Sequence, residues 1–262
     1  MPALAAVTAA LEHLAPLRLA ADWDSVGLLV APHRDQIDRV MTCLTLTPEV
    51  VAEAVRAGAD LVVSHHPLPF RPMQRITTAT GPGRAVLDLI HAGAGIWSSH
   101  TAWDSAAGGI NDQLAHLLEL AHVSPIGPDL HLPQVGFGRA GVAGENSTVA
   151  DVAARAGKAL GVSRVQLAGD ATRAAGRVGI VCGSGGDCLE EVRQSGCHTL
   201  VTGEIKLHQA IEAVAAGLAV VAVGHHASER FSMDVLAGRL AAAVAGLSCW
   251  ASRDERDPLG WL

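Results

Sequence analysis

The chain has 262 residues and a mass of 27.0 kDa, enough for one large domain or two smaller ones. Hydrophobic residues make up 49% and charged residues 17%, which excludes an intrinsically disordered protein and predicts a soluble, globular one. The chain has 19 basic and 26 acidic side chains, so its net charge is −7. It contains no run of Lys or Arg that could bind a nucleic-acid backbone.

The first expected element is an amphipathic helix within residues 1–20. No basic residue precedes Arg18, and Glu12 lies inside the apolar segment, so the pattern does not fit a secretory signal peptide. No run of 18 apolar residues predicts a membrane-spanning helix. Five cysteines without a C-x-x-C pair are typical of a reducing compartment and exclude a structural zinc knuckle. We therefore expect a cytoplasmic protein that does not bind a membrane.

Short β-branched runs then alternate with longer stretches rich in Ala and Leu. RVMTCLTL begins at Arg39, a helical pattern spans residues 48–57, and ADLVVS begins at Ala59. This alternation is the signature of βα units. The predicted fold class is α/β, with largely parallel sheets covered by helices.

The sequence also contains a weak internal repeat at a constant offset of 138 residues. Under that offset Arg39 and Val40 align with Arg177 and Val178, and the segment GADLVVSHH aligns with GCHTLVTGE without a gap. Chance similarity in an alanine-rich chain is the alternative. We predict two α/β repeats, residues 1–124 and 125–262, with related strand ends that face a common centre.

Histidine is the unusual residue, with 13 copies against no tyrosine and three phenylalanines. Several of them follow apolar segments that are expected to be strands. Three such strands end in polar groups: His65 and His66, then His100 and Asp104, then His225 and Glu229. Ligands of α/β sheets collect beyond the carboxyl ends of the strands, so these side chains are the candidate site.

Imidazole and carboxylate groups are ligands for divalent transition metals. In the second and third groups the acid follows the histidine by four residues, which places both on one face if a helix begins there. For any single histidine, a hydrogen-bonded structural role is the alternative. Five ligands are too many for one ion with an open position and too few to enclose two, so the pattern favours two divalent ions that share carboxylates.

Five segments, in this order, resemble the GTP cyclohydrolase I type 2 / NIF-three-like family, whose members are also described as dinuclear-metal-centre hexameric proteins. They are ADWDSVGLLV at Ala21, SHHPLPF at Ser64, SHTAWDSAAGGINDQLA at Ser99, TGEIKLHQA at Thr202 and GHHASER at Gly224. The resemblance implies two intertwined α/β repeats and a toroidal homohexamer. It also implies two metal ions per chain, with Zn, Fe and Mn as alternatives, held by His65, His66, Asp104, His225 and Glu229.

The family name implies a hydrolase that opens the imidazole ring of GTP and releases formate. Another nucleotide hydrolase, a dinuclear phosphoesterase and a non-catalytic metal-binding scaffold for partner proteins are the alternatives. The sequence departs from the family where Ser25 and Ala102 replace its usual asparagines. The ligand Asp104 is retained, but the amide expected beside it is absent.

Some neighbouring residues have open roles, and no catalytic base is assigned. Glu204 aligns with His66 and is either a proton-transfer or ligand-orienting residue, or a helix cap. His100 either orients Asp104 or only closes a strand. The loop from Asp22 to Asp24, with Trp23 between them, either lines the cleft or serves only in packing. GSGGD at Gly183 is either a phosphate loop or a glycine turn in which Asp187 caps a helix.

Overall fold

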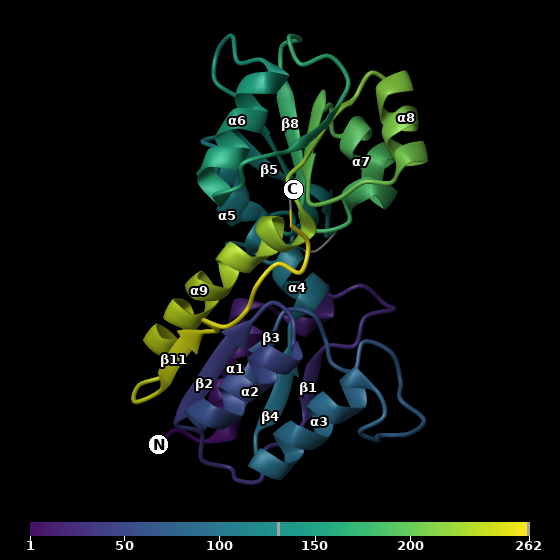
Figure 1. The fold of residues 1–262 in the computed structure, drawn as a ribbon. Coiled ribbons are helices and arrows are strands. Elements are labelled where there is room, and N and C mark those ends of the chain that lie inside the picture. The colour runs from purple at the N-terminus through teal and green to yellow at the C-terminus, as the bar shows by residue number, and fades with distance from the viewer. Residues whose placement is uncertain (130–131, 261–262) are drawn as a thin grey trace. The chain divides into compact units, whose positions relative to one another are not determined.

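The computed structural model describes residues 1–129 and 132–260 and contains two mixed sheets covered by helices (Figure 1). The predicted α/β fold class is confirmed. By its internal contacts the chain divides into two compact units, Met1–Trp103 with Ser232–Leu262, and Asp104–Phe231. The predicted division into repeats 1–124 and 125–262 follows the sequence similarity rather than these units, and it stays a prediction.

The first unit contains a five-stranded sheet in the order β1-β4-β3-β2-β11. Its elements are α1 (Leu4–Leu14), a 3-10 turn (Leu17–Leu19), β1 (Gly27–Val30), β2 (Arg39–Cys43), α2 (Pro48–Ala57), β3 (Leu61–Ser64), α3 (Gly81–Ala92), β4 (Gly95–Ser98), the start of α4 (His100–Ser105), most of α9 (His225–Ala243) and β11 (Ser248–Ala251). Strands β11, β2, β3 and β4 are parallel, and β1 is antiparallel to β4.

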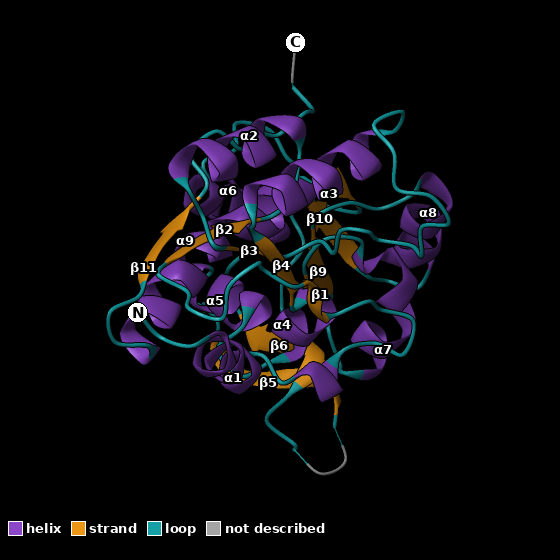
Figure 2. Cartoon of the chain, turned by 90° about the horizontal axis from the view of Figure 1, so that it is seen from below, coloured by secondary structure: helices purple, strands orange, loops and turns teal. Residues whose placement is uncertain are grey.

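Helices α2 and α3 pack on one face of this sheet (Figure 2). Their apolar side chains form one core with those of β2, β3 and β4. Thr47 caps the start of α2 by accepting a hydrogen bond from the backbone of Val50, and Gly58 ends the helix in the left-handed conformation, with φ of 63°. Within residues 1–129 and 132–260, no helix has both the length and the apolar character needed to cross a membrane.

The second unit contains a six-stranded sheet in the order β5-β6-β8-β9-β10-β7. Its elements are the end of α4, α5 (Ile110–Leu117), β5 (Ala121–Pro128), β6 (Gly136–Val142), α6 (Val149–Leu160), β7 (Gln166–Ala168), β8 (Arg177–Val181), a 3-10 turn (Gly185–Cys188), α7 (Leu189–Gln194), β9 (Thr199–Thr202), α8 (Leu207–Ala215), β10 (Ala219–Ala222) and the start of α9. Strands β8, β9 and β10 are parallel, and the remaining pairs are antiparallel. Helices α7 and α8 pack on one face, with α5 and α6 on the other side of the sheet (Figure 1).

The repeat predicted from the sequence is preserved in the strand register. In the first unit Val40 of β2 pairs with Leu61 of β3, and in the second unit Val178 of β8 pairs with Thr199 of β9. Both pairs are related by the same offset of 138 residues. The following strand, β4 or β10, then adds in parallel in each unit. Each repeat therefore presents the carboxyl ends of three parallel strands as a place for polar side chains.

Candidate metal centre

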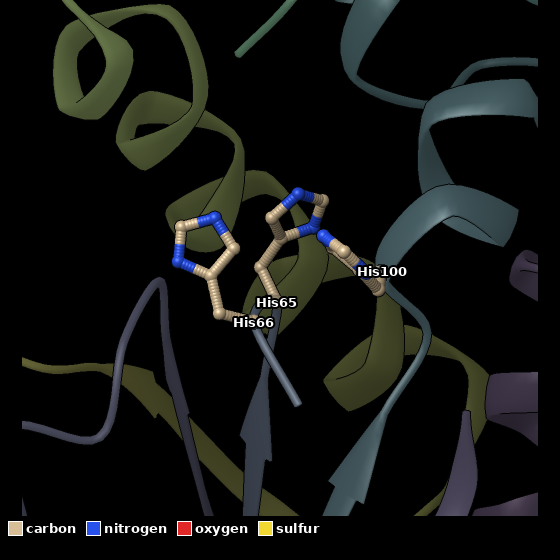
Figure 3. A group of neighbouring side chains, drawn as sticks. All are labelled: His65, His66 and His100. Atoms are coloured by element: carbon tan, nitrogen blue, oxygen red, sulfur yellow. The ribbon is translucent and has the colours of Figure 1, made fainter. Parts of the chain in front are cut away.

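In the first unit three imidazole rings gather where β3 and β4 end. His65 and His66 follow β3, and His100 begins α4 directly after β4 (Figure 3). The ring centroid of His100 lies 5.1 Å from that of His65 and 5.6 Å from that of His66. One nitrogen from each ring lies within 4.8 Å of the others, a spacing that could hold a metal ion. The strand ends thus bring together three residues that the sequence placed in two groups.

A hydroxyl group orients the His66 ring. Thr45 Oγ1 lies 2.7 Å from His66 Nδ1. When Nδ1 holds the proton and donates it to Thr45, Nε2 keeps its lone pair for a metal. The backbone is fixed as well, because the His66 amide donates to the carbonyl of Leu44 and the side chain of Glu255 accepts the amides of Leu44 and Thr45.

A carboxylate orients the His100 ring. Asp24 Oδ1 lies 2.8 Å from His100 Nδ1, and Asp24 Oδ2 accepts the hydroxyl and amide protons of Thr101. Burial by itself raises the pKa of Asp24, but these hydrogen bonds outweigh burial and hold the pKa below its ordinary value. His100 has φ of 28°, a backbone conformation that is uncommon for residues other than glycine. His100 is therefore paired with Asp24, a partner that neither sequence alternative included.

In the second unit His225 lies between two carboxylates. Its Nε2 is 3.1 Å from Glu229 Oε2, one helical turn along α9, and its Nδ1 is 3.2 Å from Glu204 Oε1. The hydrogen bond to Glu229 is the main cause that raises the pKa of His225 to about 9, and Glu204 adds to the effect. Ser184 donates to Glu204 at 2.5 Å and is the main cause that lowers the pKa of that carboxyl. Glu204 is thus a hydrogen-bond partner of His225 and not the cap of α8, whose N-cap position is Lys206.

Asp104 and Glu229 approach the same buried thiol in the second unit. Burial raises the pKa of Cys182 well above its ordinary value, and the negative charges of Asp104 and Glu229 raise it further. Asn111 ties this region together, because its amide donates to the Asp104 carbonyl and its oxygen accepts the Cys182 amide. The two predicted carboxylate ligands, Asp104 and Glu229, therefore both lie close enough to Cys182 to raise the pKa of its thiol.

The glycine loop after β8 makes room for Glu229. Gly183 has φ of 62°, and a β-carbon added there would lie 2.3 Å from Glu229 Oε1 and 3.3 Å from His225 Nε2. The expected cap by Asp187 is wrong, because the N-cap position of α7 is Cys188 and Asp187 instead accepts a hydrogen bond from Gln209. The close packing of a short 3-10 turn against the neighbouring strand and helix outweighs the capping preference here.

The donor set within each unit fits a divalent transition metal. Two ligands that are each about 2.0–2.1 Å from a tetrahedral zinc ion lie about 3.3 Å apart. The distance of 3.1 Å between His225 Nε2 and Glu229 Oε2 is close to this value. Glu204 and Thr45 each contact the Nδ1 atom of a predicted ligand, an arrangement that commonly orients metal-binding imidazoles. The residue types and their supporting contacts could therefore hold a metal ion.

Sequence reasoning missed three supporting residues: Thr45, Ser184 and Asn111. It named the Asp22 to Asp24 loop as a possible lining of the cleft but not the pairing of Asp24 with His100, a contact that spans 76 residues of sequence. Thr45 lies between a strand and a helix cap and resembles any turn residue. Only the predicted parallel packing of strand ends could have indicated these neighbours.

Comparison with known proteins identifies relatives over most of the chain. A family model described as Duf34/NIF3 (NGG1p interacting factor 3) matches residues 2–258. A GTP cyclohydrolase 1 type 2 homolog of Clostridium perfringens is 33% identical over 84% of this chain and 84% of its own length. The NIF3-like protein 1 of Drosophila melanogaster is 33% identical over 98% of this chain and 88% of its own length.

Solved structures show the same fold. A Bacillus cereus protein related to NIF3 superimposes with a TM-score of 0.93 and 20% identity, covering 100% of this chain and 99% of that one. A hypothetical protein of Staphylococcus aureus gives a TM-score of 0.89 and 25% identity, covering 99% of each chain.

Proposed function

This chain belongs to the Duf34/NIF3 (NGG1p interacting factor 3) family, and from that premise we propose that it is a metal-dependent hydrolase that acts on GTP or a related nucleotide. The observation that carries the proposal is the group of His65, His66 and His100 at the ends of β3 and β4. The names of the relatives from bacteria support a nucleotide as the substrate.

The proposed ligands are those named by the resemblance: His65, His66, Asp104, His225 and Glu229. Thr45 orients His66 through Nδ1, and Glu204 orients His225 in the same way. Asp24 and Thr101 hold the His100 ring in place beside the other two imidazoles. These residues fix the ligand nitrogens before a metal arrives, which reduces the ordering that binding requires.

When bound, two divalent ions supply Lewis acidity and make water a stronger nucleophile at neutral pH. The chain's own residues bind and orient the nucleotide and hold protons at defined atoms. Glu204 has a lowered pKa and accepts hydrogen bonds from Ser184 and His225, so it serves to orient the ring rather than to store a proton. His100 and Asp24 form a second hydrogen-bonded pair, which holds the His100 ring beside His65 and His66.

An assay of the full-length chain tests the proposal. Protein stripped with a chelator is reloaded with Zn, Mn or Fe and incubated with GTP and a panel of nucleotides, and released formate and phosphate are measured. We expect formate from GTP with at least one metal and none from a His65→Ala/Glu229→Ala double variant. His208→Ala, an exposed histidine on α8, is the matched control and should retain activity.

Two other outcomes point to the alternative functions. Release of phosphate without formate would identify a dinuclear phosphoesterase. Equal release by wild type and the double variant would contradict the hydrolase proposal and favour a metal-binding scaffold.

We also propose that the chain assembles as a toroidal homohexamer, an expectation supported by the resemblance to the family. Sedimentation of the metal-loaded protein should give a species several times 27.0 kDa. A monomer at micromolar concentration would contradict the proposed assembly.

A further inference from the structure

Two exposed aromatic side chains lie beside the imidazoles of the first unit. Trp23 is 66% exposed and Phe70 is 52% exposed, and no other aromatic side chain among residues 1–129 and 132–260 is counted with the exposed large hydrophobic residues. Aromatic residues make up only 3% of the chain, and burying such a ring normally stabilises a fold. Two rings left exposed at one place therefore indicate a surface that contacts something else.

The two rings come from separate segments and meet at His100. Trp23 lies in the turn before β1, and Phe70 lies in the loop after β3. Their ring centroids are 6.4 Å apart, with an angle of 52° between the planes. Each centroid also lies 6.0 Å from that of His100, in an edge-to-face arrangement. A third flat ring can lie against one of these faces and meet the edge of the other.

The position of this aromatic pair favours a small planar ligand. His100 contacts both aromatic rings and also lies 5.1 Å from His65 between centroids. A ligand on the aromatic pair therefore has its other end next to the proposed metal ligands. Bases bind to proteins by stacking on aromatic side chains in this way, with little dependence on the identity of the base.

The charge of the neighbouring loop favours a ligand with phosphate groups. From Phe70 to Leu87 the chain contains Arg71, Arg75 and Arg84 and no acidic residue, although its overall net charge is −7. Arg71 and Arg75 are exposed in the loop that carries Phe70. A nucleotide combines the flat ring and the negative charge that this region accommodates.

We propose that Trp23 and Phe70 form a binding surface for the base of a nucleotide and hold it beside His100. The inference rests on the proposed nucleotide substrate for the choice of ring, and it assigns recognition of that ring to two residues outside the predicted ligand set. It predicts that the base contributes to binding even when no metal is present and no reaction can occur.

Calorimetric titration of metal-free, full-length protein with guanosine tests the surface separately from hydrolysis. We expect measurable binding by wild type and binding that is roughly 5- to 150-fold weaker in Trp23→Ala and in Phe70→Ala. Trp23→Phe retains a ring and should bind within about fivefold of wild type. The control is Leu207→Ala, which removes a side chain that is 79% exposed on α8 and should leave guanosine binding unchanged.

Several results would overturn the proposal. They are undetectable guanosine binding by wild type, equal binding by wild type and both alanine variants, and tripolyphosphate binding as tight as that of GTP. Loss of the oligomer in Trp23→Ala without loss of guanosine binding would instead assign the two rings to a contact between copies. Guanosine binding without any hydrolysis of GTP or of the nucleotide panel by the metal-loaded protein would refute the hydrolase proposal and leave this surface in place.

Discussion

The two repeats share the same strand register but carry different side chains at the ends of their strands. The strand pairs β2–β3 and β8–β9 have the same register at an offset of 138 residues. At the end of β3 that register places His65 and His66, and at the end of β9 it places Gly203 and Glu204. The first repeat presents three imidazoles, whereas the second places the carboxylates of Glu204 and Glu229 on either side of the His225 imidazole.

This difference separates what the backbone determines from what the side chains determine. Parallel strands and the helices that follow them bring polar residues to one edge in both repeats. Neutral imidazoles bind a metal ion directly but do not balance its charge, whereas carboxylates do both. Because the pKa of His225 is raised to about 9, metal binding by the second group must displace a proton at neutral pH.

The largest expected effect is loss of metal when either group is altered. Wild type should contain about two ions per chain, and His65→Ala and Glu229→Ala should each contain about one or fewer, because each substitution removes a ligand atom. Metal content is measured by plasma mass spectrometry after gel filtration. Unchanged metal content in both variants would contradict the ligand assignment.

A pair of glycine substitutions tests the room around Glu229. Gly183→Ala adds a β-carbon 2.3 Å from Glu229 Oε1, while Gly58→Ala adds one with no described atom within 4 Å. The two glycines have similar φ values of 62° and 63°, so both variants should lose about 1 kcal/mol or more of stability. Only Gly183→Ala should also lose metal. Equal metal content in the two variants would mean that the Gly183 loop does not shape the second group.

Smaller effects are expected from the residues that orient the imidazoles. Thr45→Val removes the partner of His66, and Glu204→Gln weakens the partner of His225. Each should reduce metal affinity by about 10- to 100-fold. Competition with a chromogenic chelator measures the affinity, with Thr45→Ser as the control that keeps a hydroxyl. A loss of metal affinity in only one of these two variants would show that only the imidazole altered there depends on its hydrogen-bonded partner.

The last comparison concerns the opposite ends of the strands, away from the candidate metal ligands. Asp60 in the first repeat aligns with His198 in the second; Asp60 is buried and accepts the amides of Asp38 and Arg39, whereas His198 is exposed. Burial by itself raises the pKa of Asp60, but hydrogen bonds from Arg34 and the two amides lower it below its ordinary value of 3.8. Its stabilisation is therefore present above about pH 4 and is lost as the pH falls through the lower folded value.

Asp60→Asn should cost about 1–3 kcal/mol at pH 7, mainly through the amide contacts, because the Arg34 side chain is 56% exposed. The difference from wild type should shrink as the pH falls through the lowered pKa of Asp60. His198→Asn should change stability by less than about 0.5 kcal/mol. Urea unfolding at several pH values measures both variants, and a pH-independent deficit in Asp60→Asn would contradict the lowered pKa.

The sequence was sufficient for the α/β class, and its spacing of four residues anticipated, as a condition, the helices that begin at His100 and His225. Each of these depends on periodicity or spacing along the chain. The contacts of Asp24 with His100 and of Thr45 with His66 join residues 76 and 21 positions apart, and no periodic pattern records them. The exposure of Trp23 was left open because a tryptophan stabilises a core as readily as it lines a surface.

Anomalous diffraction from crystals of wild-type protein grown without chelator tests the metal centre most directly. We predict two strong peaks per chain at the absorption edge of the bound metal, within about 2.0–2.3 Å of ligand atoms from His65, His66, Asp104, His225 and Glu229. Fully occupied peaks at other residues, or no peak in protein that elemental analysis shows to contain metal, would contradict the account.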